Sequence, residues 1–295
     1  MPPRAAPSML DCALTGKHIA RRATAGLVAL LVGAACACAD APKRVVSVNL
    51  CTDQLAMLLA SPGQLVSVSN IASDPLVSAM VDEAAEYPMN FGRAEEVYLL
   101  HPDLVLAGQY ARTEAVDMLE RLGVPVLRVP FARSMADVAA NIRLIGTALG
   151  REEAGEAMAT DFEARLLTLQ EGVRSNPSAA LYSANGYTTG AMSLSGQILL
   201  AAGFENVADD AGIPYGGVLP MEVLVMAAPD LVITSSPYPG ASRSEDVLRH
   251  PAVQVLRSQQ RRATMSDQDW VCGTPRILAA IEALAQDRQA LEGDN

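Results

Sequence analysis

Few residues of this 295-residue chain are of the types that carry chemistry. Beyond residue 39 the only histidines are His101 and His250, and each precedes a proline at the predicted end of a helix, where a solvated histidine is the ordinary explanation. The carboxylates Asp53, Asp267 and Asp269 have no nucleophile at a recognisable spacing. The sequence has no G-x-S-x-G, P-loop, H-E-x-x-H or Rossmann glycine motif. We therefore expect no enzyme, no metal site and no cofactor.

The first 39 residues have the pattern of a secretory signal peptide. A basic stretch over 17–22 precedes a small, apolar run over 23–35, and an A-x-A pattern ends at Ala39. The apolar run is shorter than the roughly 20 residues that a membrane-spanning helix needs. We expect export to the periplasm, with a lipid anchor on Cys36 or Cys38 as the alternative.

Only two cysteines, Cys51 and Cys272, follow this leader. In an oxidising compartment a single remaining pair favours a disulfide, and two unpaired thiols are the alternative. The net charge is −11 for the whole chain; the leader contributes +3, which leaves −14 for the remainder. Such a charge excludes nucleic acid and an anionic membrane surface as partners.

The aromatic residues are few, and most of them fall in predicted loops rather than in the predicted core. Loops after the carboxyl ends of parallel strands line the ligand crevice of α/β sheets. An aromatic ring there offers a flat apolar surface with a polar tip, so we expect this set to line a ligand site, with local loop packing as the alternative for each member. The set is Tyr87, Phe91, Tyr110, Tyr187, Tyr215, Tyr238 and Trp270.

One short phrase occurs twice in the sequence. In both copies a glutamate, Glu95 or Glu222, stands seven residues before a Pro-Asp pair and an apolar run, and the two prolines, Pro102 and Pro229, are 127 residues apart. Each copy is typical of a short helix, ended by Pro-Asp, followed by a buried strand. The repeat predicts two related α/β lobes with a ligand cleft between them. Each glutamate either stabilises a helix N-terminus or docks a basic partner that contacts both lobes.

Alternating strands and helices on both sides of a long helical stretch predict two mostly parallel sheets. The stretch 135–173 has helical periodicity, no proline and one break near Leu149-Gly150. Its second part predicts a helix about 33 Å long that crosses from one lobe to the other. The predicted organisation is a leader (1–39), an N-terminal lobe (40–150), a bridging helix (151–175) and a C-terminal lobe (176–295). The predicted strands are 44–48, 65–69, 104–107, 126–129, 180–183, 231–233 and 262–265, with a turn over 49–53.

Three parts of the chain resemble a known family. They are the opening Val45-Val46-Ser47-Val48-Asn49, the two repeated phrases, and the tail from Ser266 through Trp270 to Leu278. Together they resemble the bacterial periplasmic binding proteins for vitamin B12, haem and iron–siderophore complexes, over essentially the whole of 44–291. Tyr187-Thr188-Thr189-Gly190 and Pro214-Tyr215 are similar to segments of the vitamin B12 binders in particular.

The resemblance implies a class III fold, in which two Rossmann-like lobes are joined by a single long helix. It implies a monomeric, non-catalytic protein that captures cobalamin or a ferric chelate and delivers it to the membrane permease of an ABC importer. Glu95 and Glu222 would contact arginines of that permease. The residues that would line the ligand cleft are Phe91, Tyr110, Tyr187, Tyr215, Asp267 and Trp270.

The chain departs from the vitamin B12 binders in ways that leave the ligand open. Those proteins line the cleft with several tryptophans, whereas Trp270 is the only one here. Arg93, Arg112 and Arg128 would suit an anionic ferric siderophore or haem propionates, with ordinary surface arginines as the alternative. An exported enzyme and a protein-binding sensor on the same two-lobed scaffold are the other functions to test.

Overall fold

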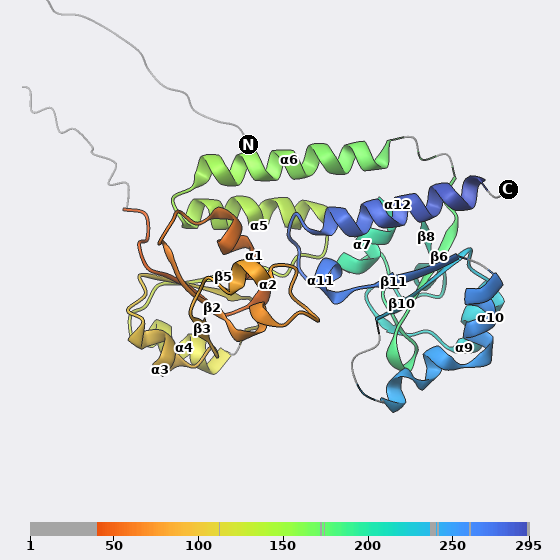
Figure 1. Cartoon of the computed structure of the whole chain (residues 1–295), viewed down its shortest axis with the longest axis horizontal. Helices are drawn as coiled ribbons and strands as arrows, with labels where there is room; N and C mark the ends of the chain where they lie inside the picture. The colour runs from red at the N-terminus through yellow and green to blue at the C-terminus, as the bar shows by residue number, and fades with distance from the viewer. Residues whose placement is uncertain are drawn as a thin grey trace, which may run out of the picture. The chain divides into compact units, whose positions relative to one another are not determined.

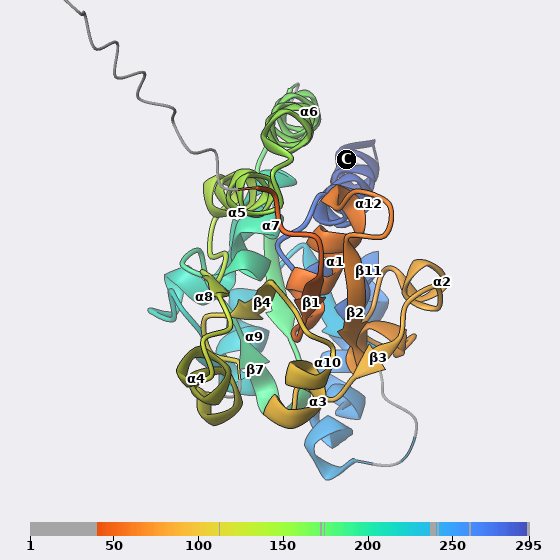
Figure 2. The same cartoon turned by 90° about the vertical axis from the view of Figure 1, so that its left-hand side faces the viewer.

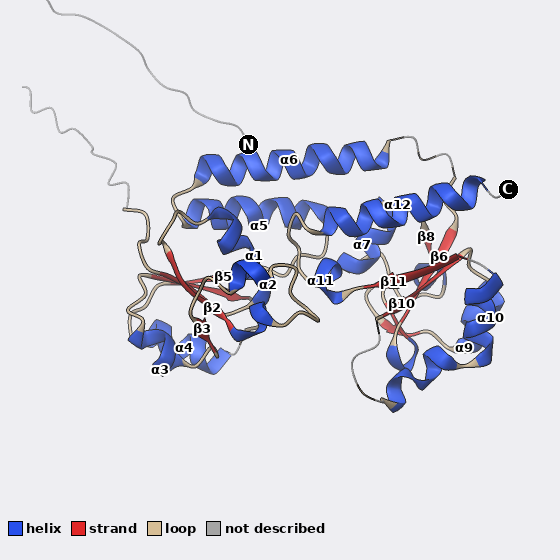
Figure 3. Cartoon of the chain, in the orientation of Figure 1, coloured by secondary structure: helices blue, strands red, loops and turns tan. Residues whose placement is uncertain are grey.

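The structure is a computed structural model that describes residues 40–111, 113–171, 173, 175–236, 240, 242–259 and 261–293. The predicted signal peptide, Arg112 and Tyr238 lie outside the described residues. Within the described ranges the chain forms two lobes, each with its own sheet, below a layer of long helices (Figure 1, Figure 3).

The first lobe has a five-stranded parallel sheet in the order β3-β2-β1-β4-β5. Its central strands are short apolar runs that are buried on both faces, as parallel strands between helical layers must be. The strands are β1 (Val45–Ser47), β2 (Leu65–Ser69), β3 (Met89–Asn90), β4 (Leu104–Gly108) and β5 (Val126–Val129).

The second lobe has a four-stranded parallel sheet in the order β11-β10-β6-β8 and a separate antiparallel pair, β7 with β9. Taken in reverse, β8-β6-β10-β11 repeats the order β2-β1-β4-β5, so the lobes share one topology. The repeated phrase supplies β4 and β10, and this confirms two related α/β lobes. The strands are β6 (Ser178–Tyr182), β7 (Tyr187–Thr188), β8 (Glu205–Asn206), β9 (Gly217–Val218), β10 (Leu231–Ser235) and β11 (Arg261–Met265).

The aspartate of the repeated Pro-Asp pair has the same structural role in both lobes. The carboxylate of Asp103 accepts hydrogen bonds from the backbone N–H groups of Lys43 and Arg44 at 2.7 and 2.9 Å, directly before β1. The carboxylate of Asp230 accepts them from the backbone N–H and hydroxyl of Ser178, the first residue of β6, at 2.8 and 2.9 Å. Each aspartate therefore fixes the start of the strand beside its own.

Helices cover both faces of each sheet, as Figures 1 and 2 show. On the outer faces, Val97 of α3 packs in an apolar cluster with Val105 of β4, and Leu224 of α9 packs in another with Val232 of β10. The helices are α1 (Leu50–Leu59), α2 (Val81–Ala84), α3 (Ala94–Leu99), α4 (Thr113–Arg121), α5 (Met135–Ala148), α6 (Glu152–Gln170), α7 (Leu194–Ala201), α8 (Val207–Asp210), α9 (Met221–Ala227), α10 (Pro251–Gln259), α11 (Asp267–Trp270) and α12 (Ile277–Gly293).

The inner faces of the two sheets share one hydrophobic core. It takes Ile142 from α5, Phe162 from α6, Ile198 from α7 and Ile281 from α12, all essentially without solvent exposure. A core that continues from one lobe to the other resists their separation, because parting the lobes would expose apolar surface.

The bridging helix α6 runs along the top of Figure 1, over α5 and towards α12. Its contact with α5 is close: a Cβ added at Gly146 of α5 would lie 2.8 Å from the Cα of Gly155 of α6. The helix ends at Gln170, before the predicted residue 173, so its 19 residues span about 28 Å at 1.5 Å per residue.

Three covalent or polar contacts tie the C-terminal segment to the first lobe. Cys51 of α1 and Cys272 form a disulfide. Arg276 pairs with Glu83 at 3.0 Å, and the side chain of Gln268 donates a hydrogen bond to the carbonyl of Pro75. The C-terminal segment is thus fastened to the first lobe by these contacts as well as by the shared core.

Two local expectations were wrong. The predicted turn over 49–53 is the first turn of α1, since Asn49 acts as its N-cap and accepts a hydrogen bond from the Cys51 N–H at 3.1 Å. The predicted strands also omitted β9, whose pairing with β7 depends on contacts distant in sequence. Short 3₁₀ turns occupy Asn70–Ser73, Ala184–Gly186 and Arg243–Arg249.

Asp53 of α1 is fully buried in the first lobe. Its carboxylate accepts hydrogen bonds from the Ser69 N–H at 3.1 Å and from the Ser69 hydroxyl. Burial nevertheless raises the pKa of the Asp53 carboxyl from 3.8 to about 6, because the interior solvates a charge poorly.

We expect Asp53→Asn to remove a pH dependence of stability. The folded pKa lies above the unfolded value, so wild-type protein loses stability as the pH rises from about 4 to about 6, by about 3 kcal/mol for this shift. Urea unfolding measures the free energy of unfolding of both proteins. The value for Asp53→Asn minus the value for wild type should rise by about 3 kcal/mol between pH ~4 and pH ~7. A difference that stays constant over this range would contradict the raised pKa.

Candidate functional site

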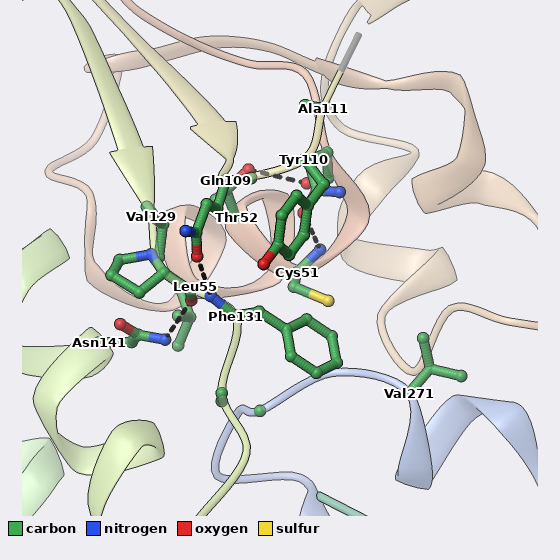
Figure 4. Close-up of a pocket in the computed structure, with 15 residues that line it drawn as sticks. Cys51, Thr52, Leu55, Gln109, Tyr110, Ala111, Val129, Phe131, Asn141 and Val271 are labelled. Carbon is green, nitrogen blue, oxygen red and sulfur yellow. Dashed lines mark hydrogen bonds between the residues drawn. The ribbon is translucent and has the colours of Figure 1, made fainter. Parts of the chain in front are cut away.

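A cavity of about 350 Å³ lies at the carboxyl ends of β1, β4 and β5. This is the sheet edge at which open α/β folds bind ligands. Tyr110 follows β4 and Phe131 follows β5, and both project from these neighbouring strand ends (Figure 4). Val271 and Gly273, which follow α11, also line the cavity, so both lobes build it.

A second cavity of about 430 Å³ lies mainly against the second lobe. Phe131 and Val271 line both cavities, so the two hollows meet there. We call them together the interlobe groove. The residues that line its second part are Phe131, Arg133, Tyr187, Thr189, Met192, Ser193, Leu194, Ser195, Tyr215, Met265, Trp270 and Val271.

Hydrogen bonds fix the first-lobe wall of the groove before any ligand arrives. The side chain of Gln109 accepts a hydrogen bond from the Phe131 N–H at 3.4 Å, and the amide of Asn141 donates to the Pro130 carbonyl at 2.9 Å (Figure 4). The segment that carries Phe131 is therefore held from β4 on one side and α5 on the other. A preformed wall lowers the ordering entropy that binding must overcome.

A tight turn presents Tyr187 on the second-lobe wall. Asn185 and Gly186 both have positive φ, 56° and 72°, which lets the chain reverse directly after β6. A Cβ added at Gly216 would collide with the Tyr187 hydroxyl, so the absence of a side chain at Gly216 lets the segment directly before β9 lie against the ring. Tyr215 stands next to this glycine and lines the same cavity.

Arg133 is the only charged side chain among the described residues that line the groove. Its backbone N–H donates to Asp137 at 2.9 Å within the N-cap of α5, which fixes its position at the start of that helix. The other lining groups are aromatic, aliphatic, amide and hydroxyl. Such a groove suits a bulky, largely apolar ligand that carries an anionic or hydrogen-bonding group.

The structure brings four of the predicted ligand residues to the groove. Tyr110, Tyr187, Tyr215 and Trp270 all line it. Trp270 is only 6% exposed, whereas the three tyrosines are each exposed by about half or more. With Phe131, which is 53% exposed, the groove therefore has one buried aromatic ring, that of Trp270, and four exposed ones.

Two other residues considered for ligand contact, Phe91 and Arg128, do not line the groove. Phe91 is absent from its lining; its ring lies beside Arg93, with the guanidinium carbon 5.9 Å from the ring centroid. The side chain of Asp267 lies outside what the structure describes, although its backbone begins α11. Arg128 pairs with Asp117 and Glu120 on α4 and does not line the groove.

Phe131 and Arg133 line the groove but were not predicted from the sequence. Phe131 comes two residues after β5, just as Tyr110 comes two residues after β4, so the rule that selected Tyr110 would also have selected Phe131. Arg133 had no comparable signal. Its place in the groove depends on the packing of the second lobe beside the start of α5.

Glu95 and Glu222 are both exposed and lie in the first turns of α3 and α9. The two helices lie at the lower side of Figure 1, on the side of the molecule opposite α6, and Figure 2 agrees. Neither glutamate lines the groove. Two equivalent acids are thus presented on one side, apart from the ligand site.

No group of three or more metal-binding side chains occurs among the described residues, and none of their helices is both long enough and apolar enough to cross a membrane. The candidate acids of an enzyme are not assembled in the groove: neither Asp53 nor Asp269 lines it. Asp269 instead accepts a hydrogen bond from the Ser266 hydroxyl at 3.1 Å.

Proteins of known name align with nearly all of the chain. It is 25% identical over 259 residues to a vitamin B12-binding protein of Pectobacterium carotovorum subsp. carotovorum (strain PC1), covering 85% of this chain and 90% of that one. It is also 25% identical to the ABC transporter substrate-binding lipoprotein YvrC of Bacillus subtilis (strain 168), covering 83% of this chain and 79% of that one.

Solved structures share the fold at lower identity. The periplasmic haem-binding protein RhuT from Roseiflexus sp. RS-1 superimposes with a TM-score of 0.69 at 22% identity, covering 84% of this chain and 98% of that one. The vitamin B12-binding protein BtuF of Vibrio cholerae gives 0.65 at 18% identity, covering 85% and 98%. These likenesses confirm the class III fold, with two lobes joined by one long helix.

The model of one protein family, described as periplasmic binding protein, matches residues 45–267. That match takes in both sheets, α6 and the repeated phrases. The chain therefore belongs to the periplasmic binding protein family.

Proposed function

We propose that this protein captures a metal chelate, cobalamin or a ferric siderophore or haem, in the periplasm and delivers it to the membrane permease of an ABC importer. Relatives are named as vitamin B12-binding and haem-binding proteins and as an ABC transporter substrate-binding lipoprotein, and members of the family are binding proteins, which favours a non-catalytic role. The protein acts as a monomer that is exported by its N-terminal signal peptide.

The observation that carries this proposal is the interlobe groove with aromatic side chains from both lobes. Tyr110 and Phe131 come from the first lobe, and Tyr187, Tyr215 and Trp270 come from the second. Two adjoining cavities of about 350 and 430 Å³ are in the size range of small-molecule sites and leave room for a macrocycle or a chelate. Flat rings on both walls suit a ligand with extended apolar faces.

Arg133 supplies the polar part of recognition. A guanidinium matches carboxylate and phosphate oxygens in a bidentate manner, and each of the proposed chelates is compatible with it through a phosphate, a propionate or an anionic oxygen ligand. Arg133 is the only charged side chain in the described lining. The groove therefore suits a ligand with one anionic group better than a ligand with several clustered negative charges.

Glu95 and Glu222 are the proposed docking points for the permease. Equivalent positions in two equivalent lobes support this role, as does their placement on one side of the molecule (Figure 1). A partner with basic side chains at two matching places would engage both lobes at once. The groove residues and the docking residues are separate sets, so capture and delivery are separable by mutation.

Phe131→Ala and Phe91→Ala provide the matched test of capture. Both phenylalanines are about half exposed, at 53% and 52%, but only Phe131 lines the groove. Cyanocobalamin, haemin and ferrichrome would be screened by thermal shift, since a ligand that binds the native state raises its melting temperature, and then titrated by calorimetry. We expect at least one of them to bind, Phe131→Ala to weaken it about tenfold, and Phe91→Ala to change the Kd less than about twofold.

Two results would count against the proposal. If none of the three chelates raised the melting temperature or gave a binding isotherm, a chelate would not be the ligand. If both phenylalanine variants weakened binding equally, the interlobe groove would not be the binding site.

A further inference from the structure

Leu99 and Met226 are large apolar side chains left almost fully in solvent, 71% and 84% exposed. Both occupy the same place in the repeated phrase, four residues after Glu95 and Glu222 respectively. A single exposed leucine or methionine is common on protein surfaces and needs no explanation. The same exposure at equivalent positions of two lobes is a second, independent observation.

The anchoring of the two helices explains why these residues point outwards. Val97 of α3 and Leu224 of α9 have no solvent exposure, and each stands two residues after its glutamate. At about 100° per residue, positions two before and two after the anchor both lie about 200° from it, on the opposite side of the helix and about 40° apart. Glutamate and apolar residue therefore stand side by side on the outermost surface of each helix.

The outer cores beneath α3 and α9 are built without these two apolar side chains. The cluster in the first lobe contains Val97, and the cluster in the second contains Leu224, but Leu99 and Met226 belong to neither. Because they lie outside these clusters, the two side chains leave exposed apolar area beside each glutamate. An apolar area next to a charge is a common composition for a protein-binding surface.

We propose that each docking point has two parts, the carboxylate of Glu95 or Glu222 and the apolar side chain of Leu99 or Met226. The inference rests on the proposed delivery function and deepens it. The partner is the membrane permease, and its surface presents, at two equivalent places, a basic side chain next to a small apolar pocket. Two equivalent sites are what a symmetric dimer of identical chains offers.

Charge complementarity selects this partner over a second copy of the same chain. In a symmetric contact between two copies through this surface, acidic patches would face acidic patches, which is unfavourable. The sequence beyond the leader carries a net charge of −14, which adds to the repulsion between copies. A basic surface on a different protein would instead be attracted both by the two glutamates and by the negative net charge of this chain.

The test uses a double variant that carries both Leu99→Ser and Met226→Ser. Its control is the single variant Leu167→Ser. Leu167 is 63% exposed and lies on α6, on the opposite side of the molecule (Figure 1, Figure 2). Purified protein, loaded with whichever of cyanocobalamin, haemin or ferrichrome it binds, is added at increasing concentration to spheroplasts of the source organism that lack the chromosomal copy. Uptake of the labelled chelate is recorded for each variant, and its Kd is measured in parallel.

We expect the double variant to need at least about tenfold more protein for half-maximal uptake, with an unchanged Kd for the chelate, because two apolar contacts are lost. Leu167→Ser should differ from wild type by less than about twofold. Equal half-maximal concentrations for the double variant and wild type would overturn this inference and leave the proposed function intact.

Two other outcomes are distinguishable. If wild-type protein binds a chelate but supports no uptake at any concentration, delivery itself is wrong and the two-part docking point is wrong with it. If sedimentation shows a wild-type dimer that the double variant abolishes, the surface belongs to a second copy of the chain and the inference is overturned.

Discussion

Replacing Cys51 and Cys272 by alanine should lower the free energy of unfolding by about 4 kcal/mol. The disulfide closes a loop of 221 residues, and cross-linking residues so far apart strongly restricts the unfolded chain. It also joins α1 of the first lobe to the segment after α11, which the ion pair of Arg276 with Glu83 ties to the same lobe. Urea unfolding monitored by circular dichroism measures the loss.

The single variants provide the control for the disulfide prediction. Cys51→Ala and Cys272→Ala should each destabilise about as much as the double variant, because either one removes the bond, and reductant should reproduce the effect in wild type. Cys272 is buried and Cys51 is half-buried, so alanine avoids placing a new polar group in the interior. Single-variant effects that sum to the double variant would show that packing rather than the bond accounts for the loss.

Reversing both proposed docking charges should abolish chelate uptake while capture stays intact. Glu95→Arg with Glu222→Arg would place like charges against a basic permease at both lobes, which costs several kcal/mol and reduces uptake by more than about 100-fold. Because neither glutamate lines the groove, the Kd for the chelate should change less than about twofold. Uptake by complemented cells and calorimetry on purified protein measure the two quantities.

A matched variant separates docking from net charge. Glu153→Arg with Glu171→Arg makes the same change in charge at the two ends of α6, where both glutamates are exposed. Uptake with this variant should stay near the wild-type level. Equal loss with both double variants would mean that overall charge, rather than two specific docking points, governs delivery.

Most of the fold could be predicted from local patterns in the sequence. The runs at 65–69 and 126–129 form β2 and β5 with the predicted bounds, because both are short, β-branched-rich runs that stand out between turns, although β5 is a half-buried edge strand that contains Arg128. The break near Gly150 separates α5 from α6 as expected. What failed were the elements that depend on distant partners, such as the pairing of β7 with β9.

The site was predicted only in part, for a physical reason. Tyr110 and Tyr187 could be selected because a loop aromatic near a strand end is a local signal. Phe91 carries the same signal, yet its ring lies beside Arg93 outside the groove. Whether a loop side chain faces the groove depends on how the two lobes are placed. Arg133 is the opposite case, because no local signal selected it and yet it lines the groove.

The most direct test of chelate capture between the lobes is quenching of Trp270 fluorescence, because Trp270 is the only tryptophan of the chain and lines the interlobe groove. Titration with cyanocobalamin, haemin or ferrichrome is predicted to quench it in a saturable manner at one chelate per protein. The Kd from quenching should equal the calorimetric Kd and should rise in Phe131→Ala. A chelate that binds tightly by calorimetry without changing Trp270 emission would place the ligand elsewhere and contradict capture between the lobes.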